Sequence, residues 1–280
     1  MRRTAARHDA SEGATAPGAD RPRLLGVARA LERLVLPRRC ALCGRLETEP
    51  ELGWCRDCHA GCERIASPLC TVCGLPFATE GDEDHACGEC GTAPPPFAAH
   101  RSWGVYGGTL AQVLLAFKFG RRTHLGRPLA ALLAEAFAEL TTDPVDAIVS
   151  VPMGLGRLYT REFNQAAVLA DRLGRLLRRP HDPRLLRRSA RRPPQVGLSG
   201  RERRENVRGS IAVARPALAR GRRLLVIDDV MTTGATIREC ARLLRLAGAR
   251  EVLALTVARG GLRDPRGVDG ATMLDDRSEV

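Results

Sequence analysis

Lysine is almost absent from this chain of 280 residues, since Lys118 is the one lysine among 44 basic residues. Aromatic residues are scarce as well, at 4%, so a core has to be built mainly from leucine, valine and alanine. No apolar run approaches the ~18 residues of a membrane-spanning helix, which argues against a membrane span. Residues 8–20 are small and polar where a secretory leader would be apolar, so we expect no signal peptide and a cytoplasmic location.

The net charge is +12 and the isoelectric point is near 10.0. Such a charge attracts polyanions, for example nucleic acids, nucleotides and pyrophosphate. The arginine bias of a GC-rich genome would produce the same charge without any such role. No helix-turn-helix or comparable module is evident in the sequence, so sequence-specific reading of DNA is not expected.

Segments of different composition divide the chain. Residues 1–22 are small and charged, and we expect this N-terminus to be disordered. Residues 23–93 combine an amphipathic helix with a cysteine-rich module. The three prolines at 94–96 are typical of a stiff linker, which predicts a boundary before a second domain over residues 97–260. Residues 261–280 are expected to form a flexible tail.

Nine of the ten cysteines lie between residues 40 and 90. In a reducing compartment such cysteines are metal ligands or free thiols and not disulfides. Eight of them form CxxC pairs, namely Cys40 and Cys43, Cys55 and Cys58, Cys70 and Cys73, and Cys87 and Cys90. These pairs can supply two tetrahedral sites of four sulfur ligands. They favour two structural zinc ions, with an iron–sulfur cluster as the alternative.

The grouping of these cysteines is open at this stage. Consecutive pairs could share a metal, or the pairs could interleave. Cys62, His59 and His85 could act as substitute ligands, whereas Cys240 falls within a helical pattern and fits a core thiol. Closed four-sulfur sites leave no open coordination position, so the module should support the structure or contact a partner and not catalyse a reaction.

Beyond residue 98, apolar strands alternate with amphipathic helices. Buried strands are expected at residues 145–151, 223–228 and 251–258, and helices at 109–119, 128–140, 163–178 and 236–247. This alternation is typical of βαβ units. It predicts an α/β domain with a parallel sheet flanked by helices.

A candidate binding loop follows the expected strand at 223–228. The strand ends in Asp228 and Asp229, and the next helix is opened by the small residues Thr232, Thr233, Gly234, Ala235 and Thr236. A helix N-terminus presents unpaired N–H groups, and glycine lets the backbone approach a phosphate closely. The carboxylates repel phosphate and suit the neutral hydroxyls of a ribose, directly or through a metal. The pattern predicts a ribose 5-phosphate site, and an ordinary strand–turn–helix with a threonine cap is the plain alternative.

The segment from Val226 to Thr236 resembles the signature of type I phosphoribosyltransferases. Over about residues 30–260, the chain resembles the ComF family, in which a cysteine ribbon precedes a phosphoribosyltransferase-like domain. The resemblance also rests on Leu36-Pro37 before Cys40, Tyr106-Gly107-Gly108, Lys118-Phe119-Gly120, Val151-Pro152, Arg161 with Phe163-Asn164-Gln165, Pro194 to Ser199, and Arg201 to Val207. One departure is Glu162, at a position where the family has glycine.

The resemblance implies a ligand and a division of roles. The ligand would be phosphoribosyl pyrophosphate, or a related ribose 5-phosphate, bound with Mg²⁺. Asp228 and Asp229 would hold the ribose at the catalytic centre, and residues 232–236 would hold the 5-phosphate. The turn after the strand at 145–151 would bind pyrophosphate through Met153, Gly154, Leu155, Gly156 and Arg157, together with Arg161. In such enzymes a flexible loop closes over the site, and here it would include Arg201, Arg203 and Arg204.

Two functions remain open. The first is a phosphoribosyltransferase, a glycosyltransferase that passes ribosyl phosphate to an unknown acceptor. The second is a non-catalytic adaptor that senses the ligand or binds DNA, because the arginine-rich loop could also contact a nucleic-acid backbone. The ComF resemblance implies a link to natural competence and DNA uptake, with single-stranded DNA and competence-machinery proteins as partners. Residues 259–270 contain no base-stacking aromatic residue, which weakens the case for a nucleobase-salvage enzyme.

Overall fold

The computed structural model describes residues 39–46, 54–78, 83–120, 122–154, 162–189 and 209–262. Two compact units divide the chain, residues 1–39 and residues 40–280, and every element named below belongs to the second unit. Three sequence-based predictions lie outside the described residues. They are the disordered N-terminus at 1–22, the amphipathic helix that follows it, and the tail at 261–280 apart from its first two residues.

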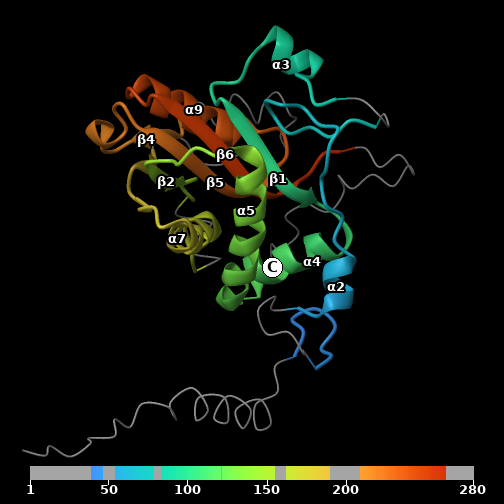
Figure 1. The fold of residues 1–280 in the computed structure, drawn as a ribbon. Coiled ribbons are helices and arrows are strands. Elements are labelled where there is room, and N and C mark those ends of the chain that lie inside the picture. The colour runs from blue at the N-terminus through green and yellow to red at the C-terminus, as the bar shows by residue number, and fades with distance from the viewer. Residues whose placement is uncertain are drawn as a thin grey trace, which may run out of the picture. The chain divides into compact units, whose positions relative to one another are not determined.

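A four-stranded parallel sheet forms the centre of the second unit (Figure 1). Its strands are β1 (Ala99–Val105), β2 (Ala147–Ser150), β5 (Arg223–Met231) and β6 (Glu251–Arg259), in the spatial order β1-β6-β5-β2. All three pairings between neighbouring strands are parallel. The sheet confirms the predicted α/β architecture and the three predicted strands.

The sheet differs from the sequence-based expectation at two places. The sequence pattern predicts no strand at β1, because His100 and its neighbours are polar. His100 is nevertheless fully buried, since Nδ1 bonds to the carbonyl oxygen of Cys73 at 3.0 Å and Nε2 to the hydroxyl of Thr256 at 3.1 Å. Burial lowers the pKa of His100 to about 3, so the ring is neutral. β5 runs to Met231, beyond the expected end at residue 228, because it pairs with β6 as far as Arg259.

Four helices confirm predicted ones, namely α4 (Gly108–Phe119), α5 (Gly126–Leu140), α7 (Gln165–Leu177) and α9 (Ala235–Leu246). Shorter elements are α2 (Arg56–Ala60), α3 (Gly88–Thr92), η1 (Thr123–Leu125) and η2 (Pro216–Leu218). The strands β3 (Leu186–Arg188) and β4 (Ile211–Val213) form a second, antiparallel sheet. None of the helices in the described part of the chain combines the length and apolarity that crossing a membrane would need.

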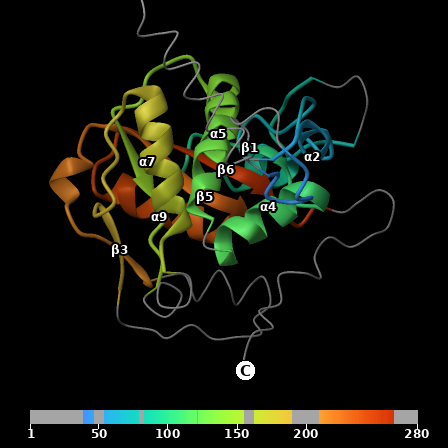
Figure 2. The ribbon, with the colours of Figure 1, turned by 90° about the horizontal axis from the view of Figure 1, so that it is seen from below.

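Alternate side chains of each strand face opposite sides of the sheet. On one side, Leu225 and Ile227 of β5 pack with residues of α4, α5 and α7. On the other side, Leu224 and Val226 pack with residues of α9, including the fully buried thiol of Cys240. Figures 1 and 2 show helices on both faces of the sheet. Because both faces are covered, the strands β2, β5 and β6 are largely continuous apolar runs.

The cysteine-rich module shares its buried clusters with the sheet domain. Cys40 and Trp54 belong to the cluster that contains α4, α5 and α7. Cys70, Cys73 and Cys90 belong to the cluster that contains α9. The boundary at residues 94–96 therefore stays a prediction, and apolar contacts cross it on both faces of the sheet.

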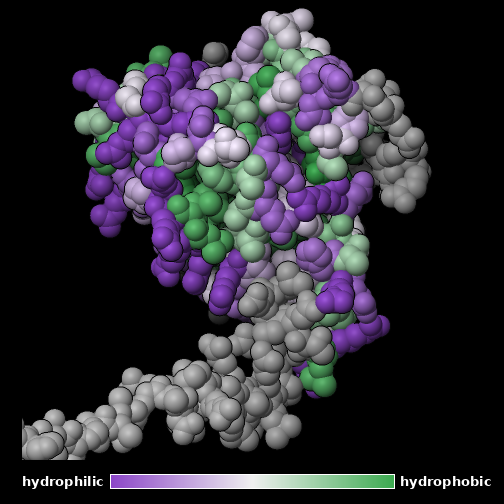
Figure 3. Space-filling view, viewed as in Figure 1, coloured by the Kyte–Doolittle hydropathy of each residue, from purple (hydrophilic) through white to green (hydrophobic). Residues whose placement is uncertain are grey.

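The surface in Figure 3 is mostly hydrophilic, and hydrophobic residues gather over α7 beside α5. Leu176 of α7, for example, is 54% exposed. Apolar atoms contribute much of the surface of any folded protein, and we assign no function to this patch.

Backbone hydrogen bonds join the module to the edge of β1. The N–H of Ile65 donates to the carbonyl of Trp103 at 3.1 Å, and the N–H of Val105 donates to the carbonyl of Glu63 at 2.8 Å. Gly104 lies between these two bonds. A Cβ atom at Gly104 would lie 2.6 Å from the carbonyl oxygen of Glu63. Glycine is therefore required for this close approach of two backbones.

We expect Gly104→Ala to lower the free energy of unfolding by about 1–3 kcal/mol, because the added methyl group overpacks a backbone contact. Gly107→Ala is the matched control, since Gly107 has extended backbone and open space around its Cβ position. That control should stay within about 0.5 kcal/mol of the parent protein. Urea denaturation of both variants measures the difference, and equal stabilities would contradict the close approach.

Candidate functional site

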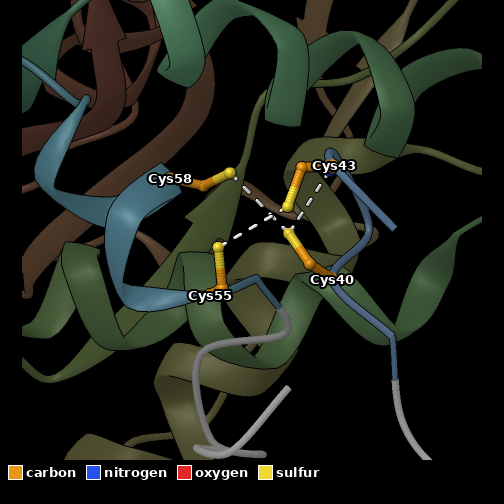
Figure 4. Close-up of side chains that lie close together, drawn as sticks. All are labelled: Cys40, Cys43, Cys55 and Cys58. Atoms are coloured by element: carbon orange, nitrogen blue, oxygen red, sulfur yellow. Dashed lines mark hydrogen bonds between the residues drawn. The ribbon is translucent and has the colours of Figure 1, made fainter. Parts of the chain in front are cut away.

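Each cysteine tetrad brings its sulfur atoms together. One tetrad consists of Cys40, Cys43, Cys55 and Cys58, and the other of Cys70, Cys73, Cys87 and Cys90, and within each all ligand atoms lie within 4.8 Å of one another. Figure 4 shows the side chains of the first tetrad pointing toward a common centre. The consecutive grouping of the CxxC pairs is therefore the one that the fold adopts.

The spacing of the sulfur atoms fits a tetrahedral metal site. The Sγ–Sγ distance is 3.6 Å between Cys43 and Cys55, and 3.9 Å between Cys73 and Cys87. Zn–S bonds of about 2.3 Å at tetrahedral angles place sulfur atoms about 3.8 Å apart. Both tetrads thus have the geometry of closed structural zinc sites.

The two tetrads share one local backbone fold. Gly44 and Gly74 follow their CxxC pairs with φ of +72° and +65°, in the left-handed region that favours glycine. The N–H of the second cysteine of each pair points at the sulfur of the first, at 3.5 Å in the first tetrad and 3.4 Å in the second. Such N–H groups stabilise a thiolate, which is the form that binds zinc.

The residues considered as substitute ligands have other contacts. The ring of His59 is stacked on Trp54 with centroids 6.4 Å apart, and the ring of His85 is stacked on Phe77 at 4.3 Å. The thiol of Cys62 donates to the carbonyl oxygen of Cys58. None of His59, His85 and Cys62 belongs to either tetrad in the described structure, so a substitute role for them is wrong.

The predicted ribose-binding acids lie at the carboxyl end of β5. Asp228 and Asp229 are partly buried, and the N–H of Asp229 donates to Oδ1 of Asp228 at 2.9 Å. Lys118, in the last turn of α4, places Nζ 3.2 Å from Oδ2 of Asp229. Burial and the negative charge of Asp229 raise the pKa of Asp228 to about 7, although Lys118 and Arg188 act in the opposite direction. The negative charge of the two acids is only partly compensated, so they can accept further positive charge or hydrogen-bond donors.

Tyr106 brings a hydroxyl group close to these charges. Its side chain is 6% exposed, and its backbone N–H donates to the carbonyl oxygen of Arg259 at 2.7 Å. Burial raises the pKa of the phenol, and the charges of Lys118 and Asp229 act on it with opposite signs. Among the described residues, the Tyr106 hydroxyl has no hydrogen-bond partner. A buried hydroxyl normally has a partner, which can be a protein group or an ordered water molecule.

The predicted phosphate loop connects β5 to α9. Thr232 and Thr233 form the connection, Gly234 caps the helix, and Ala235 and Thr236 begin it. Gly234 has φ of +70°, and a Cβ atom there would lie 2.7 Å from Cε of Met231. The first N–H groups of an α-helix have no partner within the helix, and the helix dipole adds positive potential. The loop can therefore bind an anion beside the acids.

The predicted pyrophosphate turn lies only partly within the described residues. Met153 and Gly154 are partly buried after β2, and a Cβ atom on Gly154 would meet nothing within 4 Å. Leu155, Gly156, Arg157 and Arg161 lie outside the described residues, as do Arg201, Arg203 and Arg204 of the predicted flexible loop. The roles predicted for these residues stay predictions.

Glu162 stands where the resembling family has glycine. It adopts φ of +64°, in the left-handed region that favours glycine. Asn164, two residues further on, caps α7, because its side chain accepts from the N–H of Ala167 at 3.4 Å. The same side chain donates to the carbonyl of Val151 at 3.0 Å. The glycine-type backbone is thus adopted here by a glutamate.

Sequence reasoning missed three residues around the acids. Lys118 and Tyr106 belong to the stretches that carry the family resemblance, but the sequence alone assigns neither of them a role. Arg188 of β3 donates from Nε to the carbonyl oxygen of Pro152 at 3.1 Å and from Nη1 to the hydroxyl of Ser210 at 2.8 Å. A signal for Lys118 was present in the sequence, because a single lysine in an arginine-rich chain is unusual.

Two family models match the chain in succession. The double zinc ribbon domain matches residues 31–91, and the phosphoribosyl transferase domain matches residues 165–277. The DNA utilization protein YhgH of Escherichia coli K12 is 34% identical over 223 residues, which are 78% of this chain and 96% of that protein. Competence protein F of Haemophilus influenzae is 31% identical over 229 residues, which are 79% of this chain and 96% of that protein.

Solved structures show weaker likenesses. Glutamine phosphoribosylpyrophosphate amidotransferase of Bacillus subtilis is 19% identical with a TM-score of 0.37, over 57% of this chain and 34% of that chain. Adenine phosphoribosyltransferase of Saccharomyces cerevisiae is 15% identical with a TM-score of 0.32, over 50% of this chain and 72% of that chain. These scores are too low to carry an argument. The identity with full-length relatives, the two matched domains and the paired tetrads instead decide the assignment, and the chain belongs to the ComF family.

Proposed function

We propose that this chain binds phosphoribosyl pyrophosphate with Mg²⁺ at the carboxyl end of β5. The supporting observation is that paired acids, the Lys118 counter-ion and a helix N-terminus converge on one short segment. Ribose hydroxyls and a 5-phosphate need opposite electrostatic surroundings. Asp228 and Asp229 offer acceptors to the hydroxyls, and residues 232–236 offer donors to the phosphate. The matched phosphoribosyl transferase domain supports the same class of ligand.

Mg²⁺ would accompany the pyrophosphate group. This ion prefers oxygen ligands and commonly binds through substrate phosphates together with one or two carboxylates. The partly compensated pair Asp228 and Asp229 fits that preference. When bound, the ion neutralises the charge of the leaving pyrophosphate. The turn from Met153 to Arg157, with Arg161, would offer N–H and guanidinium donors to the same group.

The reaction that this arrangement supports is transfer of the ribosyl phosphate group to an acceptor. The bond between C1 of the ribose and the pyrophosphate oxygen breaks, and its electron pair leaves with pyrophosphate as the acceptor bonds to C1. Positive charge developing at C1 is stabilised by the nearby carboxylates of Asp228 and Asp229, and Asp229 can take the proton of the acceptor. Arg201, Arg203 and Arg204 would cover the site and exclude water, which would otherwise hydrolyse the ribosyl group.

We expect wild-type protein to bind phosphoribosyl pyrophosphate in titration calorimetry with Mg²⁺ present. Asp228→Asn with Asp229→Asn should weaken binding by about 10- to 100-fold, because hydrogen bonds to a charged acceptor contribute about 1.5–3 kcal/mol. Asp171→Asn is the matched control, since Asp171 is a half-buried acid of α7 that pairs with Arg175 away from β5. Absence of binding by the wild-type protein would refute the proposed ligand.

The affinity should also rise with pH through about 7, because the pKa of Asp228 is raised to about 7 and the ionised carboxylate accepts stronger hydrogen bonds from ribose hydroxyls than the protonated acid does. The same raised pKa makes the folded state less stable as pH rises from about 4 to about 7, since the unfolded chain ionises this acid more readily. Calorimetry from pH 5.5 to 8.5 measures the trend, with Asp228→Asn as control for the titration of the ligand's own phosphates. Identical profiles for the two proteins would exclude Asp228 as the titrating group.

A second function, the handling of single-stranded DNA, is favoured by two observations. Relatives covering most of this chain are named DNA utilization protein and competence protein. The chain itself carries a net charge of +12. A cytoplasmic location and contacts with competence-machinery proteins belong to this second proposal. A screen for pyrophosphate release with candidate acceptors separates a transferase from an adaptor that only senses the ligand.

For DNA handling, we expect fluorescence anisotropy to detect binding of a single-stranded oligonucleotide that weakens steeply with salt. The logarithm of the binding constant should fall linearly with the logarithm of salt concentration, by about 0.7 for each phosphate neutralised. Replacing Arg201, Arg203 and Arg204 together with glutamine should make this slope shallower by about 2. A flat salt response of the wild-type protein would argue against backbone binding.

A further inference from the structure

Arg259 is the last residue of β6, and it contacts both the second cysteine tetrad and the strand end that leads into the phosphate loop. We propose that Arg259 is a positioning residue that couples zinc in the second tetrad to the ribose 5-phosphate site. Zinc and the sugar phosphate would then each strengthen the binding of the other. This inference rests on the proposed function, since it assigns a support to that same site.

The side chain of Arg259 points toward the second tetrad. Nη1 donates to the carbonyl oxygen of Cys73 at 2.5 Å, and Nη2 lies 3.9 Å from the Cys73 sulfur. Arg259 is 8% exposed and Cys73 is 4% exposed. Four thiolates around Zn²⁺ carry two net negative charges, and buried charge requires a partner. The guanidinium group of Arg259 is such a partner, because its charge lies beside one of the sulfur ligands.

The backbone of Arg259 contacts the elements of the proposed ligand site. It pairs with Met231, the last residue of β5, and the next N–H, of Gly260, donates to the carbonyl of Met231 at 2.9 Å. A Cβ atom on Gly260 would lie 3.2 Å from Cγ2 of Thr232, so the start of the phosphate loop packs on this segment. The carbonyl of Arg259 accepts from Tyr106, whose hydroxyl lies among the charges of the site. Displacement of Arg259 would therefore move the loop and Tyr106 together.

A second connection reaches the phosphate loop from its other side. Glu89 of α3, which carries the last cysteine of this tetrad, pairs with Arg238 at 3.0 Å. Arg238 lies in the first turn of α9, and its guanidinium group lies 5.9 Å from the ring centroid of Phe97. Phe97 is buried in one cluster with Cys70, Cys73 and Cys90. The helix that would receive the phosphate is thus held by the same tetrad.

A third connection runs through β1. The carbonyl of Cys73 accepts from Nδ1 of His100 as well as from Arg259. Since a carbonyl can only accept, Nδ1 carries the ring proton and Nε2 accepts from the Thr256 hydroxyl, 3.1 Å away. Thr256 lies opposite Asp228 in the pairing of β5 with β6. The Cys73 carbonyl is therefore bonded to two strands that line the site.

The first tetrad has a different set of neighbours. Its module bonds to β1 through Glu63 and Val105, and to α5 through Arg64 and Glu135, whose side chains lie 3.1 Å apart. Arg45 beside this tetrad is 71% exposed and pairs with Asp57 at 2.7 Å. The contact with α5 lies on the face of the sheet opposite α9, and the bond to Val105 reaches β1 at the residue that pairs with the backbone of Arg259. The side chain of Arg259 contacts Cys73 of the second tetrad, so the first tetrad is the internal control for coupling through that side chain.

The test measures zinc release from the full-length, zinc-loaded protein with a chromogenic chelator. Two release phases are expected, and Cys40→Ser with Cys43→Ser assigns the phase of the first tetrad. Saturating phosphoribosyl pyrophosphate with Mg²⁺ should slow the phase of the second tetrad by about fivefold or more, which is the usual range for coupling between two sites. The phase of the first tetrad should be unchanged. Equal slowing of both phases would overturn the proposal, because it would indicate general stabilisation.

Arg259→Met tests the coupling residue directly. It should speed zinc release from the second tetrad and weaken the binding of phosphoribosyl pyrophosphate by about tenfold. It should also abolish the effect of the ligand on zinc release. Arg45→Met removes an arginine beside the first tetrad and should change none of these quantities. If Arg259→Met folds and keeps wild-type zinc release and ligand affinity, the proposal is wrong.

Glu89→Gln keeps the test decisive if Arg259→Met does not fold. It breaks the exposed pair with Arg238 without changing the core, and it should shift zinc release and ligand affinity in the same directions by smaller factors. If the wild-type protein binds no phosphoribosyl pyrophosphate, the proposed function fails by itself. Hydrogen exchange at the amides of residues 231–236 then tests the coupling alone, since Glu89→Gln and zinc removal from the second tetrad should both speed it. Unchanged exchange would overturn the inference.

Discussion

The parallel pairing of β5 with β6 positions the functional parts of this chain. It runs from Arg223 opposite Glu251 to Met231 opposite Arg259. At its beginning, the N–H of Arg223 donates to Asp146 at 2.7 Å and its guanidinium group pairs with Glu251. These contacts fix the register of β5 on β6. At the carboxyl end of the two strands, that register places the acids of β5 beside the first turn of α9. A slip of one residue would move each of Asp228 and Asp229 to the other face of the sheet, and it would separate Asp229 from Lys118.

Charge acts at two scales in this protein. The net charge of +12 draws anions toward the molecule as a whole. Within the site the local charge has the opposite sign, because two carboxyl groups lie near the single ammonium group of Lys118 with little solvent around them. A lysine suits this position, since its compact ammonium group pairs with one carboxylate without the planar fork that an arginine would introduce. In the proposed function, the acids would hold a sugar by its hydroxyls and the neighbouring helix N-terminus would hold the phosphate.

Much of the fold could be predicted from the sequence, because its signals are local. The apolar runs in β2, β5 and β6 and the CxxC spacing each report on a few consecutive residues. β1 could not be predicted, since the burial of His100 depends on Cys73 and Thr256, which are distant in sequence. The same holds for the site. Asp228, Asp229 and residues 232–236 form one segment, whereas Lys118, Tyr106 and Arg259 reach it only through the order of the strands.

The proposed function depends on the segment from Asp228 to Thr236, which would hold a ribose 5-phosphate. A crystal structure of the full chain grown with phosphoribosyl pyrophosphate and Mg²⁺ tests it most directly. We expect the ribose hydroxyls within hydrogen-bond distance of the carboxylates of Asp228 and Asp229, and the 5-phosphate on the N–H groups of residues 232–236. A ligand bound elsewhere on the protein, with this segment in contact with solvent alone, would contradict it.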